Sequence, residues 1–194
     1  IFAESCGCPN SGRVEYRDYA KWQIEYSVKR EYEEEAVMEL ENHIAECNDY
    51  RKLFKNFAEY ILSLSCDGVY IVVDKKLLEA DMDTTFPTDG FDRKNMVIGY
   101  AAEKEGEVHI ADAKELERYL DENGLQTFYM FSPIHFREQL VGYTILKNPA
   151  FLYENPYFYD VHSVFVSKLE NLLKQTKLKN IYNRDPLTKL YNRV

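Results

Sequence analysis

The sequence lacks the long apolar run that a membrane-spanning helix requires. A bilayer core needs roughly 20 consecutive apolar residues, and charged or turn-forming residues interrupt this chain well before that length. It also lacks an excess of positive charge, because 33 acidic residues against 24 basic ones give a formal net charge of −9. Since phosphate backbones and anionic lipids attract basic proteins, we expect neither a nucleic acid nor a membrane as partner.

Cysteines are few, and no Asn-x-Ser/Thr glycosylation acceptor is present. The number and spacing of the cysteines do not match a disulfide framework, so we expect free thiols at Cys6, Cys8, Cys47 and Cys66. The basic-then-apolar start of a secretory signal is missing. The chain begins at Ile1 rather than at a methionine, which is typical of a piece of a longer protein. We therefore predict a cytoplasmic fragment.

Helical periodicity dominates both ends of the chain. Residues 1–12 are rich in turn formers and are expected to be a linker or the tail of a preceding domain. Residues 13–66 favour helix, and their second half shows the spacings of three and four that are typical of a coiled coil. This stripe is broad enough to pack on its own domain and on a partner at once. Residues 157–184 show similar spacing and predict a connecting helix. The residues expected to form the dimer and signalling helices are Val37, Leu40, Ile44, Phe54, Ile61, Phe165, Leu169 and Leu172.

Residues 67–156 change to strand periodicity. Residues 69–73 form a short apolar, β-branched run, which predicts a strand buried on both faces. Further strands are expected at residues 96–102, 108–110, 125–132 and 139–147, the last two as an antiparallel hairpin. Asp112 with Glu115 three residues later predicts a helix start, and residues 75–95 should be mostly loop. This order predicts an α+β fold with an antiparallel sheet flanked by long N- and C-terminal helices.

Motifs that carry chemistry are scarce. The sequence has no phosphate-binding glycine loop and no His-Glu-x-x-His motif. The acidic run in residues 81–92 lacks the glycine and the final glutamate of an EF-hand loop, so we expect no metal and no cofactor. The aromatic strands suggest a small-molecule pocket beneath the loop at 75–95, since such pockets are mainly apolar. Its candidate lining residues are Tyr100, Tyr129, Phe131, His135 and Tyr143. The alternative is that these rings fill the core between sheet and helices.

Two resemblances to known families add to these patterns. The order of elements over about residues 50–179 resembles sensor domains of the GAF and PAS type. Residues 185–193 read Asp-Pro-Leu-Thr-Lys-Leu-Tyr-Asn-Arg. They resemble the Asp-x-Leu-Thr-Gly-Leu-x-Asn-Arg opening of GGDEF domains, the diguanylate cyclases, and depart from it at Lys189. The matching positions are Asp185, Leu187, Thr188, Leu190, Asn192 and Arg193.

The second resemblance implies a parent chain that joins two GTP molecules into cyclic di-GMP, under the control of an upstream sensory domain. Residues 185–194 would be the truncated beginning of the GGDEF domain, so this fragment is not expected to be an enzyme by itself. We expect a cytoplasmic homodimer that responds to an unknown small-molecule ligand and signals through its helices to the downstream GGDEF domain. The alternatives are a structural dimerisation spacer without a ligand and a metal-dependent enzyme that uses the acidic loop.

Overall fold

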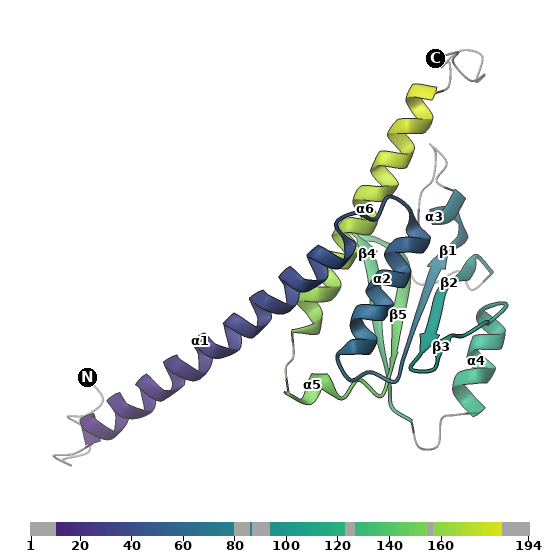
Figure 1. Ribbon diagram of the computed structural model, residues 1–194. Helices are drawn as coiled ribbons and strands as arrows, with labels where there is room; N and C mark the ends of the chain where they lie inside the picture. The colour runs from purple at the N-terminus through teal and green to yellow at the C-terminus, as the bar shows by residue number, and fades with distance from the viewer. Residues whose placement is uncertain (1–10, 80–85, 87–93, 123–126, 155–156, 184–194) are drawn as a thin grey trace.

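The computed structural model describes residues 11–79, 86, 94–122, 127–154 and 157–183. In these residues the predicted α+β fold is confirmed, with an antiparallel sheet and long N- and C-terminal helices that pack together (Figure 1). The helices are α1 (Ser11–Ile44), α2 (Tyr50–Ser63), α3 (Lys75–Glu79), α4 (Ala113–Glu122), α5 (Phe151–Glu154) and α6 (Phe158–Asn183). The strands are β1 (Gly68–Asp74), β2 (Met96–Glu103), β3 (Gly106–Glu107), β4 (Tyr129–Phe136) and β5 (Gln139–Lys147).

The five strands follow the order β3-β2-β1-β5-β4, so the first long strand lies at the centre of the sheet. Every residue of β1 is buried, as its apolar run predicts. Alternate side chains enter two separate cores: Val69 and Ile71 lie on the face of α1, α2 and α6, whereas Tyr70 and Val72 lie on the face of α4. The two-sided cover explains why this strand has no polar face.

The larger core lies between the sheet and the three long helices. Leu40 of α1 and Phe57 of α2 are completely buried there together with Phe165 of α6. The rings of Phe57 and Phe165 stack with their centroids 4.0 Å apart. This apolar contact fixes α6 against α2, and α2 in turn packs on β1 and β2.

The segment predicted as one long helix consists of two helices. Residues 45–49 separate α1 from α2, and the side chain of Asp49 accepts a hydrogen bond from the backbone N–H of Lys52 at 2.8 Å. Asp is a preferred N-cap residue because it satisfies a free N–H of the first turn. The three-and-four spacing continues across the break because α1 and α2 both face the larger core. The pattern therefore reports a shared core and not one continuous helix.

The predicted hairpin is present as β4 and β5, joined at Arg137 and Glu138. Arg137 has a φ of 57°, which is the left-handed conformation of a tight turn. β4 continues through Pro133, whereas the predicted strand ends at residue 132. Proline is tolerated there because β4 is the edge strand of the sheet.

The strand predicted at 108–110 is not formed, and β3 comprises Gly106–Glu107 instead. The backbone N–H of Val108 still donates to the carbonyl of Ala101 at 2.9 Å, but pairing ends there. The predicted helix start at Asp112 is confirmed. Its side chain accepts from the backbone N–H of Glu115 at 2.8 Å, while the Glu115 carboxylate accepts from the backbone N–H of Ala111 at 2.6 Å.

The two long helices extend beyond the body of the domain in different directions (Figure 1). The N-terminal half of α1 projects as an arm, and α6 leaves the domain at its C-terminal end. None of the described helices is long and apolar enough to cross a membrane.

Candidate functional site

The candidate pocket residues do not gather at one place. Tyr129 and Tyr143 pack against the smaller core on the face of α4, and Phe131 on the same face has its ring centroid 6.3 Å from that of Tyr143. The side chain of Phe131 is 60% exposed, and His135 on β4 is exposed as well. Tyr100 belongs to the larger core on the opposite face. The structure thus unites three of the five residues and separates Tyr100 from them.

A β-bulge at Gly99 explains the position of Tyr100. Ile71 of β1 pairs with Tyr100, whereas the next residue, Val72, pairs with Ile98, so Gly99 is an extra residue in β2. The bulge changes the phase of the strand and turns Tyr100 toward the helices. A side chain at Gly99 would also meet the ring of Phe54 at 2.8 Å, which explains why glycine occupies the bulge.

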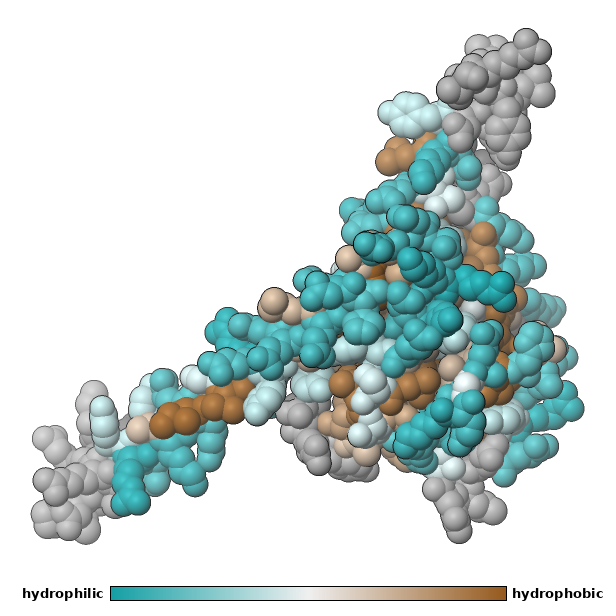
Figure 2. All heavy atoms as spheres, in the orientation of Figure 1, coloured by the Kyte–Doolittle hydropathy of each residue, from teal (hydrophilic) through white to brown (hydrophobic). Residues whose placement is uncertain are grey.

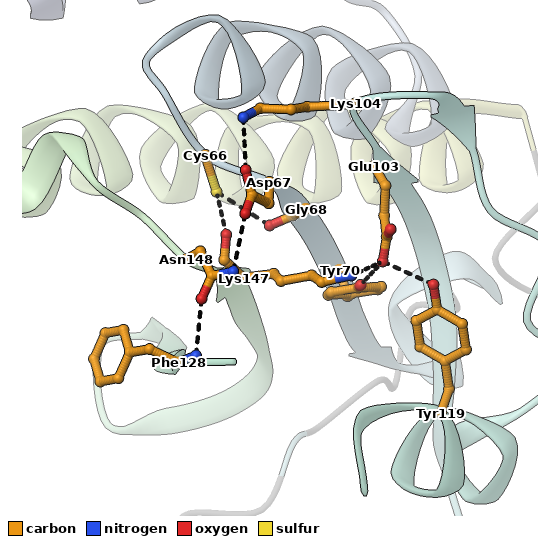
Figure 3. Close-up of polar contacts among 10 residues, drawn as sticks. All are labelled: Cys66, Asp67, Gly68, Tyr70, Glu103, Lys104, Tyr119, Phe128, Lys147 and Asn148. Atoms are coloured by element: carbon orange, nitrogen blue, oxygen red, sulfur yellow. Dashed lines mark hydrogen bonds and ion pairs between the residues drawn. The ribbon is translucent and has the colours of Figure 1, made fainter. Parts of the chain in front are cut away.

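Sequence reasoning missed a cluster of hydrogen-bonded polar side chains around Glu103 (Figure 3). Glu103 at the end of β2 accepts hydrogen bonds on one carboxylate oxygen from the Tyr70 hydroxyl, the Tyr119 hydroxyl at 2.8 Å and the Lys147 ammonium at 2.9 Å. Both charged side chains are mostly buried, with 13% of Glu103 and 15% of Lys147 exposed. The cluster joins β1, β2, β5 and α4.

Gly68 makes room for this cluster. It is the register partner of Glu103 on one side of β1 and of Lys147 on the other. A Cβ at Gly68 would lie 3.2 Å from the Glu103 Cγ and 3.3 Å from the Lys147 Cβ. The absence of a side chain at this position therefore allows the two charges to meet across the central strand. The sequence hint was that two apolar strands end in residues of opposite charge, but only the register brings them together.

The electrostatics of the cluster favour the charged forms. Burial raises the pKa of Glu103, but the hydrogen bonds from Tyr70, Lys147 and Tyr119 outweigh it and hold this pKa below its usual range. Burial lowers the pKa of Lys147, whereas the Glu103 carboxylate more than compensates and raises it. A general acid or base works best with a pKa near the operating pH. The pKa of Glu103 is lowered and that of Lys147 is raised, so both lie further from neutral pH than usual. This favours a structural role for the pair.

A second polar group lies beside the first and closes the same end of the sheet (Figure 3). Asp67 forms an ion pair with Lys104 at 2.6 Å and accepts a hydrogen bond from the Asn148 amide at 2.9 Å. Asn148 also accepts from the backbone N–H of Phe128 at 2.8 Å. Hydrogen bonding by Lys104 is the main reason that the pKa of Asp67 is lowered. These contacts connect the start of β1 with the end of β5.

Cys66 precedes this group, and its thiol donates to the carbonyls of Gly68 and Lys147 at 3.1 and 3.3 Å. Burial raises the pKa of the Cys66 thiol to about 11. Because the thiolate is the reactive form, this cysteine is held in an unreactive state.

A groove of about 580 Å³ lies between the β4–β5 turn and the C-terminal part of α6. Its lining combines aromatic and aliphatic side chains with charges of both signs, and Lys174 pairs with Glu170 at 2.8 Å on one wall. The lining residues are Phe86, Phe136, Arg137, Glu138, Gln139, Glu170, Leu173, Lys174 and Lys177. None of the predicted pocket residues borders it. Its significance is that a molecule bound there contacts both the sheet and the helix that leaves the domain.

The residues predicted for the dimer and signalling helices lie in the chain's own core. Leu40, Ile44, Phe54, Ile61, Phe165, Leu169 and Leu172 are buried, and Val37 packs against them. They are therefore engaged by α1, α2, α6 and the sheet within one chain.

His162 lies in the same core and was not singled out from the sequence. The imidazole is 6% exposed, and its Nε2 is 3.2 Å from the hydroxyl oxygen of Thr144 on β5. The rings of Phe57, Phe158 and Phe165 surround it. Burial lowers the pKa of His162 to about 4. Its spacing in the sequence, four residues after Phe158 and three before Phe165, places it on the apolar stripe of α6 and could have indicated that it is buried.

Several predicted features lie outside the described residues. These are Cys6 and Cys8, the acidic residues at 81–92, and the GGDEF-like positions Asp185, Leu187, Thr188, Asn192 and Arg193. Among the residues that the structure does describe, no three His, Cys, Asp or Glu side chains are grouped so that they could hold a metal ion. Comparison with protein-family models and with curated proteins found no match to this chain.

Proposed function

We propose that the chain is a regulatory module of the GAF or PAS type that forms a homodimer in the cytoplasm. In this proposal the module senses a small molecule and passes the signal through its helices to a GGDEF domain that begins at Asp185. The central first strand and the long bounding helices support the sensor part, and the motif at 185–193 supports the output part.

The observation that carries the proposal is the course of α6. Its first half is buried against the sheet through Phe158, Val161 and Phe165. The helix then runs without interruption to Asn183, two residues before Asp185. Its 26 residues correspond to about 40 Å at about 1.5 Å per residue. One continuous helix thus extends from the core to within two residues of the motif in the sequence.

Two features connect the sheet directly with α6. The Thr144 hydroxyl of β5 lies at hydrogen-bond distance from His162 of α6, and the groove near Arg137 has α6 as one wall. Packed helices move between discrete arrangements because their interfaces resist continuous deformation. A ligand that favours one arrangement would therefore shift or rotate the whole of α6 and whatever follows it.

The first experiment tests transmission through α6 in a chain extended beyond Val194. One alanine inserted after Tyr182 rotates the following segment by about 100°, whereas a seven-residue helical insertion nearly restores the original direction. We expect the single insertion to change the rate of cyclic di-GMP formation from GTP and the longer one to preserve it. Equal rates in all three proteins would contradict transmission through helix rotation. A downstream sequence without a Gly-Gly-Asp/Glu-Glu-Phe element would contradict the output domain itself.

The structural spacer is the second candidate, because the predicted pocket residues Tyr100 and Tyr129 are packed into two different cores. Native mass spectrometry of the purified chain separates the two. A dimer that carries additional non-covalent mass supports the sensor, and a dimer of bare chains favours the spacer. A chain that stays monomeric at all concentrations contradicts both the sensor and the spacer, because each is a dimer.

A further inference from the structure

The projecting arm of α1 exposes a row of large aromatic side chains. Tyr16, Tyr19, Trp22 and Tyr26 are each more than half exposed. The rings of Tyr19 and Trp22 stack with centroids 6.0 Å apart, and those of Trp22 and Tyr26 with centroids 5.5 Å apart. At about 100° per residue, the four side chains occupy about 120° of the helix circumference. We call this row the aromatic stripe.

The aromatic stripe continues the face by which α1 packs on its own domain. Ala36, Leu40 and Ile44 lie on that face further along the helix and are buried against α2 and α6. Contact begins near Ala36, whose carbonyl accepts a hydrogen bond from Tyr60 of α2 at 2.8 Å. Before that point the described part of the chain offers no cover, as the projecting arm shows (Figures 1 and 2). One helix face thus changes from covered to uncovered at about residue 33.

We infer that the aromatic stripe is covered by the same stripe of a second copy of this chain, in a parallel two-stranded coiled coil. The inference rests on the dimer of the proposed function and locates its interface on the arm, because the seam residues predicted from the sequence are engaged within one chain. Tyr19, Trp22 and Tyr26 follow the spacing of three and four that places residues at the core of a coiled coil. The two α1 helices diverge near Ala36, where each begins to pack on its own domain.

The charges beside the stripe favour the parallel orientation. With Tyr19 and Tyr26 at the a positions, Glu25 occupies a g position and Arg30 the following e position. In a parallel pair, each g residue lies beside the following e' residue of the partner, so Glu25 of each copy lies beside Arg30 of the other and the dimer contains two such pairs of opposite charge. An antiparallel pair that overlays the two stripes instead brings g to g', which places Glu25 near Asp18 of the second copy, a like charge. In one chain these side chains form exposed helical pairs, Lys21 with Glu25 at 3.8 Å and Arg30 with Glu34 at 3.1 Å. Such exposed pairs are weak and exchange partners readily.

The size of the stripe fits a modest dimer interface. Four aromatic side chains of about 200 Å² each, exposed by somewhat more than half, present roughly 500 Å² per copy. Two copies therefore bury roughly 1,000 Å², which is the lower range of specific interfaces. Beyond Tyr26 the core positions become Lys29 and Glu33, and this polar layer ends the intermolecular contact near the point where α1 reaches its own domain.

Trp22 allows a direct test because it is the single tryptophan of the chain. We would measure sedimentation and acrylamide quenching of its fluorescence over a concentration series of the 194-residue protein. The test variant is Tyr19→Glu/Tyr26→Glu, which keeps the probe and adds charge to the stripe. The matched control is Ile24→Glu, because Ile24 is 65% exposed on the opposite side of the same arm.

The native chain and the control should be dimers in which Trp22 is protected at least about twofold from quenching. The stripe variant should dissociate at least about tenfold more readily, since central aromatic residues contribute most of the affinity of an interface. Two outcomes overturn the inference but leave the proposed dimer intact. One is a native dimer in which Trp22 is freely quenched, and the other is a dimer that Ile24→Glu dissociates while the stripe variant does not. A monomeric native chain overturns both. Since the arm lies outside both cores, unchanged unfolding of the variants confirms that the domain remains folded.

Orientation requires a second measurement. Spin labels at residues 17, 24 and 31, one at a time and with Cys6 and Cys8 replaced by serine, report the distance between equivalent positions of the two copies. A parallel pair gives nearly the same distance at all three positions. In an antiparallel pair the separation along the axis grows by about 3 Å for each residue away from the point where the two copies cross. The three distances would then differ, with that at residue 31 the longest, and this result would overturn the parallel arrangement.

Discussion

Acidification should destabilise the domain through the buried imidazole of His162. Burial lowers the pKa of His162 to about 4, whereas an unfolded histidine titrates near 6.5. The unfolded chain therefore binds this proton more tightly than the folded one, and stability is lost as the pH falls from about 7 toward 4. Above pH 7 the imidazole is almost entirely neutral in both states, so its titration no longer changes the free energy of unfolding.

The magnitude follows from the two pKa values. One pKa unit is worth about 1.4 kcal/mol, so the complete effect is about 3 kcal/mol. About 2 kcal/mol of this is already lost at pH 5, because the unfolded imidazole is then almost fully protonated and the folded one is not. This is a large fraction of the about 5–15 kcal/mol that stabilises a typical domain.

The assay is urea unfolding of the native chain and of His162→Phe/Thr144→Val between pH 7.5 and 4.5. The second substitution removes the hydroxyl that would otherwise lose its partner in the buried space. Carboxylates and the other three histidines are common to both proteins, so the difference between the two stability curves isolates His162. We expect this difference to change by about 2 kcal/mol between pH 7 and pH 5 in favour of the variant. Two parallel curves would refute the argument.

Substitutions centred on three further positions test close packing, a helix cap and the buried ion pair by urea unfolding. Gly142→Ala places a Cβ 2.2 Å from the carbonyl oxygen of Val72, so we expect a loss of about 3 kcal/mol or failure to fold; a native-like midpoint would contradict that geometry. Asp49→Ala should cost about 1 kcal/mol, while Asp49→Asn should cost little because asparagine also caps; equal losses would show that the cap is irrelevant. Glu103→Gln should cost about 2 kcal/mol because it leaves the Lys147 ammonium without its counter-charge, and Glu103→Gln/Lys147→Met should recover part of that loss. No recovery would mean that the ion pair is not the source of the effect.

Local patterns were sufficient for most of the secondary structure. The alternation of the hairpin, the β-branched run of β1 and the Asp112 cap of α4 depend on neighbouring residues, so the sequence predicted all three. The break between α1 and α2 was missed although Asp49 is a good N-cap, because the three-and-four spacing of apolar residues continues across it.

The grouping of side chains could not be predicted in the same way. Tyr100 and Tyr129 looked like neighbours on one face, but one extra residue at Gly99 turns the first of them to the other core. Glu103 and Lys147 are 44 positions apart and meet only because both are register partners of Gly68. Register and bulges depend on how whole strands pack, which no short segment of sequence contains.

The sequence by itself determined the α+β class, the order of the four long strands and the apolar faces of the long helices, because these follow from periodicity and local capping. Only the tertiary structure decided what covers each face. It places Leu40, Phe165 and Leu172 in the chain's own core and leaves Trp22 and its aromatic neighbours uncovered on the arm. The physical reason is that an apolar stripe specifies burial but not its partner. The partner is set by the three-dimensional path of the rest of the chain.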